Sequence, residues 1–165
     1  MEHETCAQCH FDGARYDDAE LLAAIRDLGP RWRALIATAG DKLRTRPAPE
    51  VWSAVEYAAH SRDITGIHAA GVELALTSDE PVLPPLDGDA LIESAAATYS
   101  DEKVEAVLDA LEAEANHLAG NAEIDANWER GLTIGDDRMT VRRMLEHALH
   151  DSVHHLDDVA RGLQA

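Results

Sequence analysis

Four stretches of the 165-residue sequence carry apolar residues at spacings of three and four, and this periodicity constrains the fold most strongly. Residues that recur in this way form one apolar stripe along an α-helix, because the helix turns about once every 3.6 residues. The four stretches run over about residues 17–36, 53–76, 101–118 and 140–162. No strand pattern of comparable strength is present. We therefore predict an all-α fold, a four-helix bundle with long loops.

Capping and helix-breaking residues predict where these helices begin and end. The Gly29-Pro30 pair interrupts the first stretch and predicts a kink or a short break. Ser53, with Glu56 three residues later, has the capping-box pattern at the start of the second helix. Thr140 is placed to cap the last helix. These signals agree with the apolar periodicity, so the helix boundaries rest on two kinds of evidence.

The segments between the helices are polar or rich in proline. Prolines 81, 84 and 85 prevent residues 77–89 from continuing a helix, although a short helix near residues 89–98 is expected. Residues 120–139 are expected to form a polar loop or a short extended pair. The first 16 residues are irregular and contain cysteines. We expect all 165 residues to form a single domain.

The composition limits the classes of partner. The formal charge of -18 comes from 32 acidic and 14 basic side chains, so nucleic acid and anionic membrane surfaces are not expected partners. No N-terminal apolar stretch resembles a secretory signal, and no run of about 18 apolar residues could span a membrane. We therefore expect a cytoplasmic protein with both cysteines reduced.

The last helix is rich in histidine. His150 and His154 stand four residues apart, so one face of the helix can offer both imidazoles to zinc or a similar metal. Glu146 stands four residues before His150 and lies nearer the apolar stripe, so Glu146 and His150 form a competing pair. His155 is expected to point away toward solvent. The spacing alone leaves both pairs open.

A third ligand is expected from the second helix. His60 falls on one stripe with Ile64, Ile67, Gly71 and Leu74, the stripe that a bundle would bury. His60 is therefore either a metal ligand or a hydrogen-bonded core histidine. Three protein ligands from two helices would leave one position open for water or substrate, as in catalytic metal sites.

The N-terminal CAQCH has the CxxCH spacing of c-type haem attachment. That interpretation is rejected because haem attachment needs export. A redox CxxC normally follows a strand and opens a helix, and neither is predicted at this position. Cys6, Cys9 and His10 are instead candidates for a second zinc site, completed by a residue elsewhere in the chain. The alternative is a flexible tail with two free thiols.

Several of these stretches together resemble the DinB/YfiT-like superfamily of metal-binding four-helix bundles. VWSAVEYAAHSRDI is similar to the second-helix signature of that family, and HALHDSVHHLDDV is similar to its fourth-helix signature. RPAPEVW, NWERG and the opening CAQCHFD add to the likeness, the last resembling the CxxCGFD of one subgroup. The resemblance covers nearly the whole chain.

The resemblance implies a divalent metal, with zinc and nickel as the first choices, held by His60, His150 and His154. A related group of mycothiol-dependent isomerases uses a glutamate in place of one histidine, which keeps Glu146 as the alternative metal ligand. Characterised members include thiol-dependent transferases, in which a metal-bound thiolate of mycothiol or bacillithiol type attacks the substrate, and hydrolases. Two departures are His10 in place of a glycine, and the absence of a glycine-glutamine pair after His154.

Three functional hypotheses follow. The first is a metal-dependent enzyme with a small-molecule substrate, a thiol S-transferase or alternatively a hydrolase, in which Asp63, Asp151 or Asp157 orients a ligand imidazole or takes a proton. In that case, residues 77–89 and 120–138 would shape the mouth of a pocket. The second is a non-catalytic metal-binding stress-response module. The third has no metal at all. A homodimer is plausible, because bundles of this kind often pair through a helix face.

Overall fold

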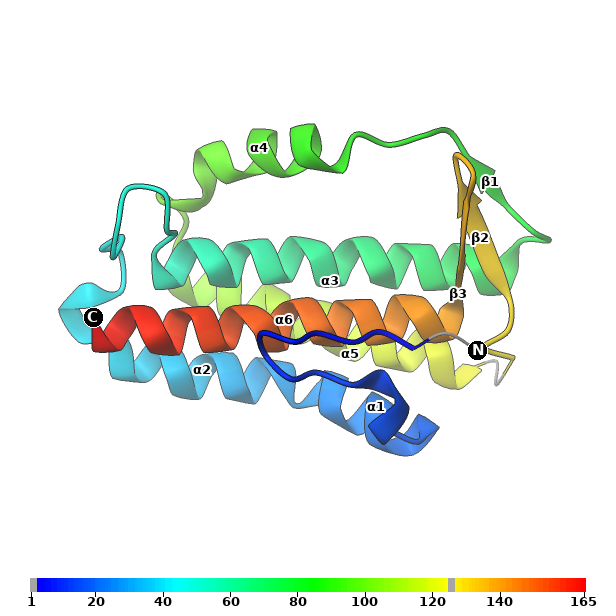
Figure 1. Cartoon of the computed structure of the whole chain (residues 1–165), viewed down its shortest axis with the longest axis horizontal. Helices are drawn as coiled ribbons and strands as arrows, with labels where there is room; N and C mark the ends of the chain where they lie inside the picture. Colours follow the sequence, from blue (N-terminus) through cyan, green and yellow to red (C-terminus); the bar gives the residue numbers. More distant parts are fainter. Residues whose placement is uncertain (1–2, 125–126) are drawn as a thin grey trace.

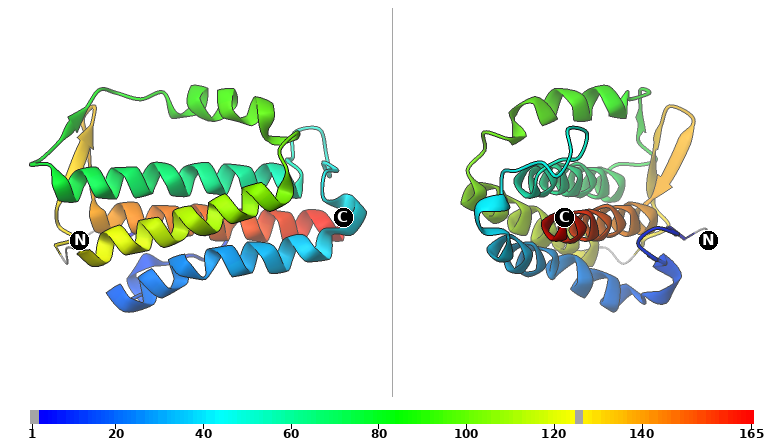
Figure 2. Two further views of the ribbon diagram at one scale, coloured as in Figure 1. Left: turned by 180° about the vertical axis from the view of Figure 1, so that it is seen from behind. Right: turned by 60° about the vertical axis from the view of Figure 1, so that its left-hand side comes forward.

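The computed structural model describes residues 3–124 and 127–165 and confirms the predicted bundle (Figure 1). Its four columns are α3 (Ala54–Thr77), α5 (Val104–Ile124), α6 (Val141–Gln164), and a column in two parts, α1 (Asp18–Arg26) and α2 (Leu28–Ala39). Short 3-10 turns lie at Gly13–Arg15 and Gly40–Lys42. A further helix, α4 (Gly88–Tyr99), lies outside the bundle, along α3 (Figures 1 and 2).

The predicted helix caps are confirmed at two places. Ser53 and Glu56 form the reciprocal capping box at the start of α3, and the Thr140 side chain accepts a hydrogen bond from the backbone N–H of Arg143 at the start of α6. The break in the first column falls at Asp27, before Gly29-Pro30. Proline is tolerated in the first turn of α2, since the N–H groups there have no partner within the helix.

A small three-stranded sheet closes one end of the space between α3 and α4 (Figure 1). β2 (Gly131–Ile134) and β3 (Asp137–Thr140) form an antiparallel hairpin, which confirms the extended pair expected in this region. β1 (Val82–Leu83) pairs in parallel with β2, although the proline-rich connection was not expected to contribute a strand. Gly135 has a φ of 60° in the hairpin turn, a conformation that glycine adopts without a steric penalty.

The expected core stripe of the second bundle helix is wrong. His60 is buried as predicted, but Ile67 is 57% exposed and Ile64 is only partly buried. The face of α3 that packs into the bundle carries mainly small side chains instead, such as Ala58, Ala59 and Ala69. Ile64 and Ile67 line a cavity on another face of α3, and a cavity wall favours the same residue types as an apolar core.

The N-terminal segment runs beside α6 and is joined to it by polar contacts (Figure 1). Glu146 is fully buried on α6, and its carboxylate accepts hydrogen bonds from the backbone N–H of Glu4 at 2.8 Å and from the Arg142 side chain. His3 Nδ1 lies 2.7 Å from the same carboxylate. In the part of the chain that the structure describes, no helix is long and apolar enough to cross a membrane.

Candidate metal centres

Two pairs of potential ligands alternate along α6 and face different neighbours. Asp151 and His155 lie four residues apart and join His60 of α3, whereas His150 and His154 join Cys6 and Cys9 of the N-terminal segment. In each group, one ligand atom from every member lies within 4.8 Å of the others. Among the described residues, His60, His150 and His154 thus fall into two groups instead of one. Each α6 pair shares a face because residues four apart are neighbours on a helix.

The group of His60, Asp151 and His155, here called the inner group, converges on one carboxylate oxygen. Asp151 Oδ1 lies 3.5 Å from His60 Nε2 and 3.5 Å from His155 Nε2. His60 is buried, while Asp151 and His155 have side chains only 17% and 18% exposed. Two imidazoles and a carboxylate form a common ligand set for zinc and other divalent metals.

Two buried atoms of the inner group lack a partner within the described residues. They are His60 Nδ1 and Asp151 Oδ2. Buried polar groups in proteins are nearly always hydrogen-bonded, so each of these atoms calls for a further partner. The donor types of the group fit a divalent cation, and the unpartnered Nδ1 is hard to reconcile with a histidine that is only a satisfied core residue.

The surrounding charges and rings fix the inner group in place. His155 Nδ1 lies 2.9 Å from Asp158 Oδ2, an arrangement that directs its Nε2 toward Asp151. Trp52 packs against the ring of His60 and Tyr57 against that of His155, with centroids 5.2 and 4.9 Å apart.

The protonation states of the group follow from these contacts. Burial opposes ionisation of Asp151, but the two adjacent histidines hold its pKa far below the usual range. Burial also lowers the pKa of His155, yet Asp151 and Asp158 outweigh it and raise that pKa. Asp151 is therefore ionised near neutral pH and available as an anionic ligand.

The expectation that His155 faces solvent is wrong, since it lies against His60 and Tyr57. Asp151, expected from the sequence only to orient a ligand or accept a proton, lies beside His60 in the place expected for His150. The sequence did contain a signal for this arrangement. Asp151 and His155 have the same spacing of four as His150 and His154. Two imidazoles are the more familiar ligand pattern, so the sequence alone favours His150 and His154.

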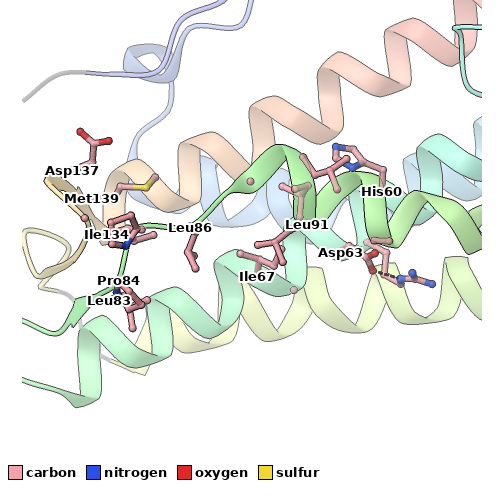
Figure 3. A pocket seen from close by; sticks show the side chains of 18 of the residues that line it. His60, Asp63, Ile67, Leu83, Pro84, Leu86, Leu91, Ile134, Asp137 and Met139 are labelled. Carbon is pink, nitrogen blue, oxygen red and sulfur yellow. Dashed lines mark hydrogen bonds and ion pairs between the residues drawn. The ribbon is translucent and has the colours of Figure 1, made fainter.

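His60 also lies in the wall of a cavity of about 1340 Å³ between α3, α4 and the sheet. Figure 3 shows His60 and Asp63 toward one end and Ile134, Asp137 and Met139 toward the other. Four large apolar side chains are more than half exposed within the described residues, and all of them line this cavity: Ile67, Val82, Leu86 and Leu91. A concave apolar surface next to converging polar groups is typical of a small-molecule site.

The polar groups in the cavity wall are mainly acidic. Asp63 accepts hydrogen bonds from Tyr99 Oη at 2.8 Å and from Arg62 Nε at 2.7 Å. Arg62, the one guanidinium that the described residues contribute to the cavity wall, also pairs with Glu102. Its positive charge is therefore already matched by two carboxylates. The wall does not resemble a site built for an anion.

The second group, here called the outer group, contains Cys6, Cys9, His150 and His154. Cys6 Sγ lies 3.7 Å from His154 Nδ1. The backbone N–H groups of Cys9 and Gln8, followed by His150, lower the pKa of the Cys6 thiol to about 6, whereas burial raises the pKa of Cys9. Glu4, His147 and His150 form a third, overlapping group. Residues that could bind a metal thus occur on two faces of α6.

The remaining predicted ligands lie elsewhere. His10 is exposed, with a φ of 59°, and belongs to none of the metal-ligand groups found among the described residues. Glu146 is likewise outside these groups, because Arg142, His3 and the Glu4 backbone already occupy its carboxylate. The cysteines thus lie near α6 histidines rather than the adjacent His10.

Comparisons with known proteins identify relatives of the fold. The family model described as the DinB superfamily matches residues 20–159. A similar solved structure is that of YfiT from Bacillus subtilis, described as "a probable metal-dependent hydrolase with an unusual four-helix bundle topology". It aligns with a TM-score of 0.75 and 16% sequence identity, over 89% of this chain and 86% of that chain. No curated protein matches the sequence significantly.

Proposed function

This chain belongs to the DinB superfamily, and we propose that it is a metal-dependent hydrolase acting on an apolar small molecule. The inner group of His60, Asp151 and His155 would hold the metal, with zinc and nickel as the first choices. The observation that carries the proposal is the position of His60, which belongs to this group and also lines the apolar cavity. The likeness to YfiT, described as a probable metal-dependent hydrolase, supports the same class of reaction.

Three protein ligands leave room for substrate or water, as catalytic sites require. A divalent cation supplies Lewis acidity, which lowers the pKa of a water molecule and polarises a carbonyl group. The protein provides the ligands and fixes their charge and orientation. Asp151 provides the negative charge between two imidazoles, and Asp158 fixes the orientation of His155 through Nδ1. Trp52 covers one side of the His60 ring.

The cavity would bind and position the substrate. Its exposed apolar side chains on α3 and α4 remove apolar substrate groups from water, which favours binding by about 25 cal/mol for each Å² buried. Asp63 lies in the cavity wall and is ionisable, so it is the residue that we assign to accept or return a proton during the reaction. Tyr99 Oη holds its Oδ2 in place.

Thiol transfer is the alternative reaction at the same site, with a low-molecular-weight thiol in place of water. The acidic cavity wall makes it the second choice for an anionic thiol, because Asp63, Glu114, Asp136 and Asp137 would repel it. A neutral thiol of mycothiol type would not be repelled by these carboxylates. The substrate's apolar portion would occupy the cavity in either reaction.

The test uses the full chain loaded with zinc or nickel and p-nitrophenyl esters of increasing acyl length. We expect hydrolysis that requires the metal, improves with acyl length, and falls by at least about 100-fold in His60→Ala and Asp151→Asn. His117→Ala, at a half-exposed histidine on α5, is the control and should keep full activity. If the metal-loaded protein does not hydrolyse the esters but couples a thiol to an apolar electrophile, the result would favour thiol transfer. Inactivity in both assays would leave a non-catalytic metal-binding module.

A further inference from the structure

We propose that the outer group of Cys6, Cys9, His150 and His154 is a second metal site, a closed zinc site that holds the N-terminal segment on α6. Its four members offer two sulfur and two nitrogen ligands, the donor set of many structural zinc sites. The inner group offers three ligands and faces a cavity, so the two sites would have different roles. This proposal does not depend on the hydrolase activity.

The spacing of the outer group suits a single zinc ion. Zinc binds sulfur at about 2.3 Å and nitrogen at about 2.0 Å, which places a sulfur and a nitrogen about 3.5 Å apart in a tetrahedral site. Cys6 Sγ and His154 Nδ1 lie 3.7 Å apart. The ligand atoms of all four residues lie within 4.8 Å of one another, so small side-chain movements would bring them into coordination.

The backbone between the cysteines turns both thiols toward α6. The N–H of Cys6 donates a hydrogen bond to the Phe11 carbonyl at 2.9 Å, which closes the turn. His10 adopts a left-handed φ of 59° directly after Cys9. A non-glycine residue in this conformation costs free energy, so the surrounding structure must hold it there. A metal bound by both cysteines would supply such a constraint.

Each histidine of the outer group has its other ring nitrogen near a carboxylate. His150 Nδ1 lies 3.0 Å from Glu4 Oε1, and His154 Nε2 lies 3.6 Å from Asp158 Oδ2. A carboxylate at one nitrogen fixes the tautomer and directs the lone pair of the other toward a metal. His150 Nε2 is buried and has no hydrogen-bond partner in the described part of the chain. That unpartnered nitrogen is the independent sign of a missing ligand.

A closed site explains how a polar segment is held in place. Phe11 is the buried apolar anchor of the segment, and its ring stacks on that of His150 with centroids 5.2 Å apart. Two thiolates neutralise the charge of one Zn²⁺, so the site adds no net charge to the bundle. Four protein ligands leave no position for substrate, and the zinc would therefore stabilise structure.

The experiment replaces zinc with Co²⁺ in the full chain and records the near-ultraviolet absorption. Cobalt bound to thiolates gives a sulfur-to-metal charge-transfer band that nitrogen and oxygen ligands do not give. We expect this band in the wild type, a weaker band in Cys6→Ser and in Cys9→Ser, its loss in the double variant, and a reduced affinity for the cobalt that produces it in His150→Ala and His154→Ala. The metal content measured by elemental analysis should fall by one metal per chain in the double cysteine variant.

Two control variants test whether the thiolate band comes from the outer group alone. His60→Ala should keep the thiolate band while losing the inner metal, so failure of the hydrolase proposal would leave this test intact. His10→Ala should also keep the band, because His10 lies outside the group. Wild-type protein that binds cobalt without a thiolate band would overturn the proposal, and this result needs no variant. A band that keeps its full intensity in Cys6→Ser, or one that is lost in His10→Ala but not in His154→Ala, would do the same.

Discussion

His154 and His155 are consecutive on α6, yet their imidazoles belong to different metal-ligand groups. Their rings are nearly perpendicular, at 87°, with centroids 5.5 Å apart. Asp158 connects them, since its Oδ2 lies 2.9 Å from His155 Nδ1 and 3.6 Å from His154 Nε2. One carboxylate thus contacts a member of both the inner and the outer group, although it belongs to neither.

Replacing Asp158 with alanine should weaken metal binding at both groups. Each histidine would lose the carboxylate that fixes its orientation, and loss of such a contact typically costs about 10- to 100-fold in metal affinity. The measurement is competition with a chromophoric chelator, which reports the affinity of each of the two metals. The same change at Asp109, an exposed residue of α5 that pairs with Arg33 of α2, is the control. An effect on only one site would show that Asp158 supports that site alone.

Replacing Glu146 with alanine should destabilise the fold without removing metal from the inner group. Glu146 is fully buried, and its loss would leave Arg142, whose side chain is 7% exposed, without its buried carboxylate partner, since its other partner, Asp18, is 72% exposed. Breaking a buried ion pair in this way costs about 3–5 kcal/mol. Denaturant unfolding measures the loss of stability, and elemental analysis of the folded protein measures the metal.

A second variant keeps this prediction testable if Glu146→Ala does not fold. Glu146→Gln preserves the shape and one acceptor oxygen, so it should fold with a smaller loss of stability and a full complement of inner metal. If either variant lost the inner metal while its unfolding free energy stayed unchanged, Glu146 would be a ligand after all. That outcome would restore the alternative drawn from the sequence.

The bundle was predictable because apolar residues recur at spacings of three and four in all four stretches, and because two of the helices begin with a capping signal. Ser53 with Glu56, and Thr140, begin helices where the sequence indicated. The ligand set was less predictable, because a helical wheel gives only the angle between side chains. It does not say which neighbouring segment each face meets. His150 faces a polar N-terminal segment, whose path depends on contacts across the chain such as that between Glu4 and Glu146.

The sequence did not predict the cavity, for a related reason. Ile64 and Ile67 have the spacing and the residue type of a core stripe, and only the position of α4 decides that they line a cavity. The proline-rich connection between α3 and α4 pairs as β1 with β2, which closes one end of this space. No local sequence pattern indicates the position of α4 or the pairing of β1 with β2.

The stability of the bundle should depend on pH through Glu56. Burial raises the pKa of this carboxyl, but hydrogen bonds from Arg46 and Ser53 outweigh it and lower the pKa from 4.5 to about 2. A carboxyl with a lowered pKa in the folded state stabilises that state fully above its unfolded pKa. The contribution is lost as the pH falls from 4.5 toward about 2.

Comparing the wild type with Glu56→Gln isolates this contribution. The wild type should be more stable by about 2–3 kcal/mol at pH 7, and the difference should vanish near pH 2. Urea unfolding across this pH range measures both proteins. A difference that stays constant with pH would mean that packing, and not the charge of Glu56, accounts for its effect.

Replacing Ile67 with serine should weaken binding of apolar molecules without destabilising the protein. Ile67 is 57% exposed in the cavity wall, so the folded bundle gains little from its side chain. A ligand that covers the side chain would gain about 1.5 kcal/mol or more from it, which corresponds to roughly tenfold in affinity. Fluorescence titration with Nile red, a neutral apolar dye, measures this affinity. Leu91→Ser on α4 should have a similar effect, whereas Ala37→Ser at an exposed position of α2 should have none. Equal dye binding by all four proteins would place the apolar ligand site elsewhere and remove the main support for an apolar substrate.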